Sequence, residues 1–323
     1  MSSLAVPRSE KSDLQPVNRF ALAVRNPIAP KLFEKYQALI YDAAGIWLSE
    51  SKTALLCGRL ARRLRSLNIE TMEEYFHHVT NPQNHDEFIL MLDAITTNET
   101  HFFREPKHFE FMAQRLFPRW KKEAEAGKRS RRIRIWSAAC SSGEEPYSLA
   151  MILLKHFPAA EGWTPEILAT DISTQVLAKA KAGIYALDKA RSIPFDLLQR
   201  FMLQGTGEQN GHMRVGPEAQ EIVRFARLNL SHDPLPVHGE FDAIFCRNVL
   251  IYFDMQSKTK VVKGLMQHLS PNGLLFVGHS ESLTGVTTKM KTLAPTIYGN
   301  VDEHDRLISD FRQQDRDLAP KVR

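Results

Sequence analysis

The spacing of hydrophobic residues changes near residue 131 and predicts two domains of different kinds. From Pro30 to about Asp93, apolar residues recur at steps of three and four, which is the period of an amphipathic helix. Within TALLCGRLARRLRSL, one helix face carries four leucines, namely Leu56, Leu60, Leu64 and Leu67. Strand-like alternation does not appear here, so we expect a small all-α domain over residues 29–98.

Beyond Arg131, short apolar runs alternate with helical stretches. The runs IRIWSAA, EILATD, FDAIFCRN and GLLFVGHS are separated by segments such as YSLAMILLKHF. This alternation predicts an α/β domain over residues 132–303, with a mostly parallel sheet covered by helices on both faces. Residues 99–131 are expected to link the two domains.

Ligands of such sheets bind at the carboxyl ends of the strands. We therefore expect four segments that are far apart in sequence to meet at one edge: Ala138–Glu145, Asp171, Asn248 and Gly278–Glu281.

Three further segments depart from this alternation. In residues 192–227, glycines separate short apolar stretches. This pattern predicts a small antiparallel β subdomain inserted in the sheet domain. Residues 1–28 are polar and contain prolines, so we expect a mobile N-terminal segment. The charged residues 304–323 are expected to form a flexible tail.

Composition and charge narrow the class of protein. The 323 residues contain no apolar run of membrane-spanning length and no secretory signal pattern. The three cysteines lie far apart in sequence, which fits reduced thiols in the cytoplasm. The net charge is +5, and much of the excess lies in Lys121–Arg134. That run suits either nucleic acid or a solvated linker, and we favour the linker because no aromatic residues interleave with the charges.

The loop WSAACSSGEEPYS predicts a site for a ligand with a positive centre. Only Gly143 remains of the glycine pattern that binds a pyrophosphate, and small residues replace the other glycines. Glu144 and Glu145 follow at a helix N-terminus, where carboxylates are favourable as caps but would repel a phosphate. S-adenosylmethionine, with its sulfonium, its ammonium and its ribose, fits such a loop better than a dinucleotide.

Asp171, at the end of EILATD, supports the same ligand. A carboxylate at this strand end can accept the ribose hydroxyl groups of an adenosyl ligand. The alternative role for Asp171 is to cap the helix that follows, although Ser173 can also do so.

Longer motifs resemble one family. The runs TTNETHFFREPKHF, SAACSSGEEPYS, LATDIS, FDAIFCRNVLIYFD and GLLFVGHSES are similar, in this order, to the CheR family of chemotaxis-receptor glutamate O-methyltransferases. The resemblance covers residues 31 to 300. It implies a Rossmann-like class I S-adenosylmethionine-dependent methyltransferase domain behind an all-α domain that recognises the receptor.

The resemblance implies roles for individual residues. The implied contacts of S-adenosylmethionine, and of its product S-adenosylhomocysteine, are Asn98, Thr100, Arg104, Glu144, Asp171, Asn229, Leu230, Asn248 and Val249. Arg104 and Tyr252 are the side chains expected near the methyl group, and no metal is implied. Lys52, Arg59 and Arg63 line the flank of the leucine face and are expected to meet receptor acids.

The resemblance also implies partners. The expected substrate is the cytoplasmic helical domain of methyl-accepting chemoreceptors, and a receptor's C-terminal pentapeptide could bind the β subdomain by strand addition. No nucleic acid and no membrane insertion are expected, and a monomer is the default.

Two other functions stay open from the residues alone. A methyltransferase of the same fold could act on RNA or on a small molecule, since fold does not assign substrate. A catalytically silent scaffold could bind the receptor without methylating it. Nicotinamide-dependent redox chemistry is disfavoured because the glycine pattern is missing.

Overall fold

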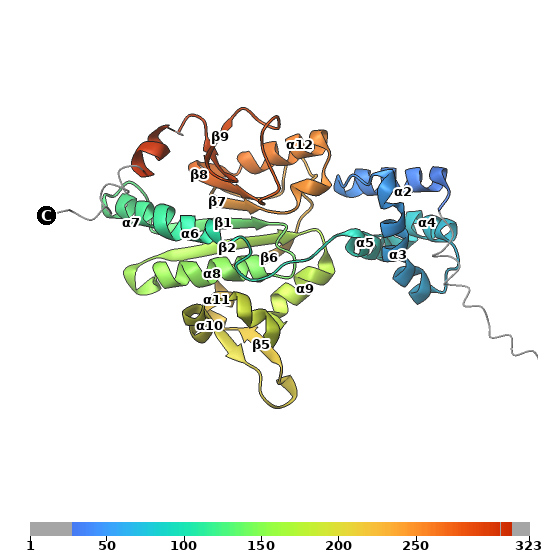
Figure 1. Ribbon diagram of the computed structural model, residues 1–323, viewed down its shortest axis with the longest axis horizontal. Helices are drawn as coiled ribbons and strands as arrows, with labels where there is room; N and C mark the ends of the chain where they lie inside the picture. The colour runs from blue at the N-terminus through green and yellow to red at the C-terminus, as the bar shows by residue number, and fades with distance from the viewer. Residues whose placement is uncertain (1–27, 304, 312–323) are drawn as a thin grey trace, which may run out of the picture.

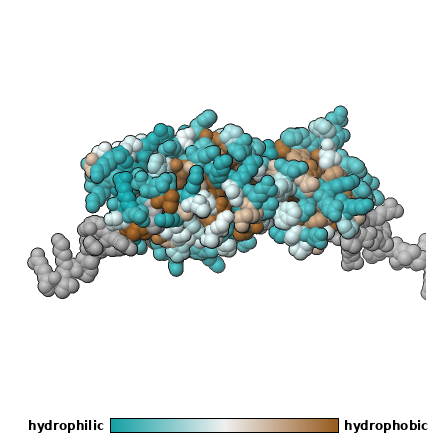
Figure 2. Space-filling model, turned by 90° about the horizontal axis from the view of Figure 1, so that it is seen from above, coloured by the Kyte–Doolittle hydropathy of each residue, from teal (hydrophilic) through white to brown (hydrophobic). Residues whose placement is uncertain are grey.

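The computed structural model describes residues 28–303 and 305–311, and it divides them into two lobes (Figure 1). The smaller lobe is all-α, and its helices are α2 (Pro30–Ala44), α3 (Thr53–Leu67), α4 (Met72–Thr80) and α5 (His85–Ile95). Residues 1–27, which belong to the N-terminal segment expected to be mobile, lie outside the described residues. Seen from above, both lobes have a largely hydrophilic surface interrupted by small hydrophobic patches (Figure 2).

The leucine face of α3 forms much of the small lobe's core, as its spacing predicts. Leu56, Leu60 and Leu64 are at most 4% exposed, and Leu67 packs against them from the edge. The helix stops at Asn68, which takes the left-handed conformation (φ 54°) and donates its amide to the carbonyls of the last turn.

The segment expected to be a linker is instead part of the larger lobe. It forms α6 (Pro106–Phe111), a π-helical turn (Met112–Leu116) and α7 (Phe117–Glu125). Its apolar side chains enter the main core, namely Phe109, Met112, Leu116, Phe117 and Trp120. The segment is therefore a buried layer, because its aromatic residues need the sheet domain to cover them.

The larger lobe is built on a seven-stranded sheet with the order β6-β2-β1-β7-β8-β10-β9. The first five strands in that order are parallel, and β10 and β9 run antiparallel at one edge. The strands are β1 (Arg132–Ala138), β2 (Thr164–Asp171), β6 (Val223–Arg227), β7 (Phe241–Cys246), β8 (Leu269–Val277), β9 (Met290–Ala294) and β10 (Ile297–Asn300). The α/β fold class predicted from the alternation is confirmed.

Two apolar layers cover the two faces of this sheet. One includes α8 (Glu144–His156), whose residues from Leu149 to Leu154 are all buried, together with the α6–α7 segment. The other includes α12 (Met255–Met266). Helix α9 (Thr174–Ala182) follows β2. Within the described residues, no helix is long and apolar enough to cross a membrane.

The inserted subdomain is a three-stranded antiparallel sheet of order β3-β5-β4, but its limits differ from residues 192–227. Its strands are β3 (Ile184–Ala186), β4 (Met202–Gln204) and β5 (His212–Val215), with α10 (Phe195–Phe201) between the first two and α11 (Pro217–Glu221) after the last. β6 instead pairs in parallel with β2 in the main sheet. As an edge strand, β6 has one exposed side, so its apolar and polar residues alternate as they would in an antiparallel strand.

The chain's last described residues also depart from the expectation of a flexible tail. Residues 305–311 are helical, with Leu307 fully buried and Phe311 8% exposed in the main core. Phe311 packs edge-to-face on Phe111 at 5.5 Å between ring centres. The four-residue spacing of these two apolar residues places them on one helix face.

Direct contacts join the two lobes. Asp93, at the end of α5, is 7% exposed and accepts hydrogen bonds from the Thr174 amide (3.1 Å), the Thr174 hydroxyl (2.9 Å) and the Gln175 amide (3.3 Å). The small lobe therefore satisfies the first amides of α9 in the larger lobe. The Trp47 amide also donates to the Tyr252 carbonyl over 2.9 Å.

Internal acids neutralise several arginines of the run Lys121–Arg134. Arg129 lies 2.9 Å from Asp242, and Arg132 lies 2.9 Å from Glu166. Arg134 adds a longer contact of 3.7 Å to Glu166. These contacts tie three of the run's seven cations to residues of neighbouring strands, so only part of the run's charge is available to a nucleic acid.

Candidate active site

A cleft opens between the lobes at the carboxyl ends of the parallel strands. It contains about 1200 Å³ of empty space, counted to its open mouth. The sequence-predicted residues that line it are Lys52, Arg59, Asn98, Thr100, Arg104, Asp171, Asn229, Leu230, Asn248, Val249 and Tyr252. Of the four segments expected to meet at this sheet edge, those of Ala138–Glu145, Asp171 and Asn248 contribute to the cleft wall. The segment Gly278–Glu281 does not line the cleft, although Glu281 accepts the Asn248 amide. Of the predicted site residues, Glu144 and Arg63 lie outside the cleft wall.

The loop after β1 turns sharply enough to expose its backbone to the cleft. Ala139 (φ 72°) and Ser141 (φ 50°) both take the left-handed conformation, which costs a non-glycine residue of order 1 kcal/mol or more. At Gly143 (φ 96°) a Cβ atom would lie 2.9 Å from the Ala180 side chain, so glycine is required there.

Asp171 fixes this loop from the end of β2. Its Oδ2 accepts the Ser141 amide over 2.8 Å and its Oδ1 accepts the Ser173 amide over 2.9 Å. Burial raises the pKa of Asp171, and these amides pull it back down. The Ser173 hydroxyl accepts the Val176 amide over 3.4 Å, so Ser173 has the helix-capping role that was the alternative for Asp171.

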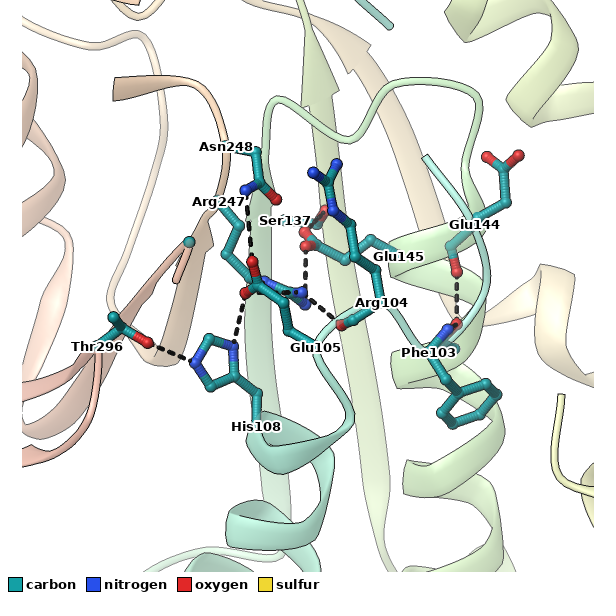
Figure 3. A network of polar contacts seen from close by, with 12 residues as sticks. Phe103, Arg104, Glu105, His108, Ser137, Glu144, Glu145, Arg247, Asn248 and Thr296 are labelled. Atoms are coloured by element: carbon teal, nitrogen blue, oxygen red, sulfur yellow. Dashed lines mark hydrogen bonds and ion pairs between the residues drawn. The ribbon is translucent and has the colours of Figure 1, made fainter. Parts of the chain in front are cut away.

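The two glutamates of the loop point in different directions (Figure 3). Glu144 is fully buried, pairs with Lys189 and accepts the Ser142 hydroxyl over 2.7 Å, and it is not among the residues lining the cleft. Glu145 lines the cleft and accepts the Ser137 hydroxyl over 2.6 Å. Successive helix residues point about 100° apart, so only one can face the ligand.

A buried guanidinium connects the cleft to the segment before α6 (Figure 3). The Arg247 side chain is 2% exposed and lies 3.0 Å from Glu105 and 3.3 Å from Glu145. It also donates to the Arg104 carbonyl. Burial raises the pKa of Glu145 in spite of Arg247 and Ser137. Burial also tends to raise the pKa of Glu105, but Arg247 and the His279 amide outweigh burial, so the pKa of Glu105 is lowered.

Glu281 positions the loop that carries Asn248. Its carboxylate accepts the amides of Asn248 (2.8 Å), Gly278 (2.6 Å) and Ile251 (3.2 Å). Asn248 itself has φ 57°, and its side-chain amide donates to Glu105 over 3.3 Å. Burial raises the pKa of Glu281, whereas these amides lower it.

The segment TTNETHFFR crosses the cleft from the small lobe. The Asn98 carbonyl accepts the Ser141 hydroxyl over 2.9 Å, which ties the segment to the loop after β1. Arg104 donates to the Glu99 carbonyl over 3.0 Å. Asn98, Thr100 and Arg104 are all part of the cleft wall.

Asn229 and Tyr252 also contact the small lobe. The Asn229 side-chain amide donates to the Ala43 carbonyl over 2.6 Å, so this side chain is used to join the lobes while its residue lines the cleft. The Lys52 ammonium lies 5.8 Å from the centre of the Tyr252 ring. Tyr252 therefore lines the cleft beside the start of α3.

The three cations predicted to meet the substrate have different environments. Lys52 and Arg59 line the cleft, and Arg59 donates to the Ile95 carbonyl and to the Thr97 hydroxyl (2.6 Å). Arg63 instead donates to the buried Glu87 over 2.9 Å and is not part of the cleft wall. Its position within the small lobe indicates a structural role.

Sequence reasoning missed two buried charges that support the site, Glu105 and Arg247. It placed the segments of Glu145 and Glu281 at this sheet edge but assigned neither residue a role in supporting the site. Arg247 directly follows β7, and Glu281 lies four residues after β8. A charged residue following a buried strand was the available signal, but its partner lies more than a hundred residues away in the case of Glu105 and Arg247.

Family models match both lobes of the chain. The CheR methyltransferase all-alpha domain matches residues 31–96, and the CheR methyltransferase SAM binding domain matches residues 98–298. A solved structure of a glycopeptide N-methyltransferase with S-adenosylmethionine covers 54% of this chain and 55% of its own at 13% identity and a TM-score of 0.29, which is too distant to bear on function.

Curated relatives are similar along most of their length. A chemotaxis protein methyltransferase from Escherichia coli is 40% identical over 267 residues, which are 82% of this chain and 89% of the relative. Chemotaxis protein methyltransferase 2 from Pseudomonas aeruginosa is 39% identical over 268 residues, which are 82% and 91% of the two chains. With both domain models matched in order and these relatives covered almost end to end, the chain belongs to the CheR methyltransferase family.

Proposed function

We propose that this protein uses S-adenosylmethionine to methylate glutamate side chains of bacterial chemoreceptors, forming γ-methyl esters. The observation that carries the proposal is the single cleft in which eleven sequence-predicted residues from both lobes meet. The cleft wall holds charges of both signs, with Asp171 and Glu145 near the loop and Lys52 and Arg59 near the mouth. It thus suits a cationic donor next to an anionic acceptor.

The proposed cofactor fits the observed donors and acceptors. Asp171 lies at the end of β2 with its carboxylate in the cleft wall, where it can accept ribose hydroxyl groups. Arg104 can orient the acceptor carboxylate near the methyl group. Asn229 and Leu230 can flank the adenine, and Asn248 and Val249 can make further contacts with the cofactor. The contact between Glu144 and the cofactor stays a prediction, because Glu145 lines the cleft instead.

The chemistry needs no general base. When bound, S-adenosylmethionine supplies a methyl group on a positively charged sulfur. A receptor glutamate has a pKa of about 4.3 and is already ionised at neutral pH. The side chains of the cleft therefore contribute by orienting the acceptor carboxylate and excluding water, rather than by moving a proton.

Tyr252 tests this division of roles. Its ring lines the cleft near Lys52, where its hydroxyl can donate to an acceptor carboxylate. We expect Tyr252→Phe to lower turnover about tenfold, because one hydrogen bond to a charged group is lost, while the affinity for S-adenosylhomocysteine stays the same. Single-turnover kinetics and calorimetry measure the two quantities, and equal losses in both would contradict the role.

The receptor would dock on the small lobe beside the cleft mouth. Trp47 and Leu55 are 47% and 45% exposed there, and Ile251 of the larger lobe is 46% exposed. This apolar surface with Lys52 and Arg59 next to it is complementary to an amphipathic helix that bears acids. Charge reversal in Arg59→Glu should weaken receptor methylation at least tenfold and leave cofactor binding intact, whereas Arg62→Glu, on another face of α3, should not.

A receptor tail is the second proposed contact. The subdomain sheet has short outer strands, and Leu203 of β4 and Ile184 of β3 are 55% and 44% exposed. A pentapeptide such as NWETF could add a strand at one of these edges. Calorimetric titration of that peptide tests the contact, and absence of heat at millimolar peptide would refute it.

One assay tests the reaction itself. The protein is incubated with tritiated S-adenosylmethionine and the cytoplasmic fragment of a chemoreceptor. Label that is released by mild base identifies a methyl ester and supports the proposal. Base-stable label, or label in nucleic acid, would indicate that the protein methylates another substrate. Cofactor binding without any methyl transfer would indicate a catalytically silent scaffold.

A further inference from the structure

Glu105, His108 and His279 form a compact cluster next to the cleft. One ligand atom from each lies within 4.8 Å of the others. Glu105 and His108 belong to the start of α6, three residues apart, and His279 follows β8. Figure 3 shows the His108 ring facing the Glu105 carboxylate on one side and Thr296 on the other.

A contact with Thr296 holds the His108 ring on one side. Its Nε2 lies 2.8 Å from the Thr296 hydroxyl oxygen, which itself lies 2.7 Å from the Pro295 carbonyl. This arrangement orients the ring so that Nδ1 faces Glu105. A neutral imidazole carries its proton on one nitrogen only, and the tautomer with the proton on Nε2 has a lone pair on Nδ1 that can bind a metal ion.

The second nitrogen faces an acceptor instead of a donor. His108 is 1% exposed, and its Nδ1 has no hydrogen-bond partner. The nearest charged atom is Glu105 Oε2 at 3.6 Å. The buried Nδ1 and the Glu105 carboxylate thus face each other across a gap that is too long for a hydrogen bond.

A metal ion is the species that such a gap accommodates. Ligands about 2.1 Å from a tetrahedral ion lie roughly 3.4 Å from one another, close to the separation of His108 Nδ1 and Glu105 Oε2. His279 is exposed, so its ring can rotate inward and solvent can reach the open positions. We propose that Glu105, His108 and His279 bind a divalent transition-metal ion such as Zn²⁺.

The ligand set also indicates which ions would compete. Two imidazoles and one carboxylate favour Zn²⁺, Co²⁺ or Ni²⁺ over Mg²⁺ and Ca²⁺, which prefer oxygen ligands. Arg247 already pairs with Glu105 Oε2 at 3.0 Å, so the ion must share this carboxylate with a guanidinium. We therefore expect micromolar affinity rather than the tight binding of a structural zinc site.

Neighbouring groups already orient the side chains of the cluster. Thr296 orients the His108 ring, and the His279 amide holds Glu105 Oε1 over 3.0 Å. Thr296 has φ 60°, an uncommon conformation for a β-branched residue, in the turn between β9 and β10. No metal was expected from the sequence, although REPKH contains the spacing Glu-x-x-His.

Metal binding to the full chain tests the proposal. After treatment with EDTA and dialysis, the protein is titrated with Zn²⁺ against a chromogenic chelator, and with Co²⁺ by its visible absorption. We expect one equivalent of Zn²⁺ to bind, at least tenfold more weakly in His279→Ala and unchanged in His238→Ala, whose exposed side chain lies elsewhere. Equal melting temperatures of all three proteins in EDTA would establish that the variants fold.

Two results would overturn the site. One is that the native chain takes up no stoichiometric Zn²⁺ at 100 μM, roughly a hundredfold above the expected dissociation constant. The other is equal uptake by the native chain and His279→Ala. Either result would leave a direct contact between a protonated His108 Nδ1 and the Glu105 carboxylate.

Discussion

Replacing Arg63 with alanine would leave a buried carboxylate without its cation. Glu87 is 7% exposed, and its Oε1 accepts hydrogen bonds from Arg63 Nε (2.9 Å) and the Tyr75 hydroxyl (2.7 Å). The hydrogen bonds to Glu87 raise the pKa of Arg63, so its guanidinium is charged at neutral pH. After the substitution, only the Tyr75 hydroxyl would remain to stabilise the negative charge.

The geometry sets the size of the effect. Removing one partner of a buried ion pair costs about 3–5 kcal/mol. The Arg63 side chain is 21% exposed, however, so water can replace part of its interaction. We therefore expect the free energy of unfolding to fall by about 2–3 kcal/mol, well above the roughly 0.5 kcal/mol of an ordinary surface substitution.

Urea denaturation followed by circular dichroism measures this loss. Arg62→Ala is the matched control, since Arg62 is exposed on the same helix. The reasoning also predicts coupling: in a Glu87→Gln background no buried charge is left behind, so Arg63→Ala should cost less than half as much. Two outcomes would contradict the reasoning: a loss of unfolding free energy in Arg63→Ala no larger than in Arg62→Ala, or the same loss in the Glu87→Gln background. In either case the ion pair does not stabilise the lobe, and Arg63 is again a candidate for contact with the receptor.

Two further predictions concern the cofactor and the chain's end. Because burial raises the pKa of Asp171, which also faces Asp93 and the Cys140 thiol, affinity for S-adenosylhomocysteine should decline as pH falls through a range above that of an ordinary aspartate. Calorimetry between pH 8 and 5 measures this affinity. Asp171→Asn should bind S-adenosylhomocysteine more weakly, with an affinity that changes less with pH. If the affinity of the native protein changes as little with pH as that of the variant, Asp171 is not the titrating group. Leu307→Ala should lower the free energy of unfolding by about 2–4 kcal/mol because it leaves a cavity, and a loss no larger than that of Arg306→Ala would mean that residues 305–311 do not pack on the core.

The parallel strands could be predicted because each is a continuous apolar run between turn signals. IRIWSAA and FDAIFCRN lie at the sheet's centre, where both faces are buried. β6 was assigned to the wrong sheet because an edge strand exposes one side and alternates like an antiparallel strand. Leu307 and Phe311 were missed because two apolar residues in a charged segment form too short a pattern to indicate a helix.

The site was predictable where function requires particular residues at strand ends, as for Asp171 and Asn248. It was not predictable where a side chain's direction decides its role. Glu144 and Glu145 are adjacent and chemically identical, and only the pairing of Glu144 with Lys189 turns it away from the cleft. In the same way, Arg63 and Arg59 lie one turn apart on α3, but only the fold of α5 gives Arg63 a buried partner.

The cap that Asp93 supplies to α9 has a consequence for how the protein can be divided. The boundary between the two matched family domains falls between residues 96 and 98, so a fragment containing only the catalytic module would begin beyond Asp93. Such a fragment would expose the Thr174 and Gln175 amides, which lie three and four residues from Asp171. Exchanging recognition modules between relatives would therefore require a carboxylate at this junction, because the first turn of a helix in one module is completed by a side chain from the other.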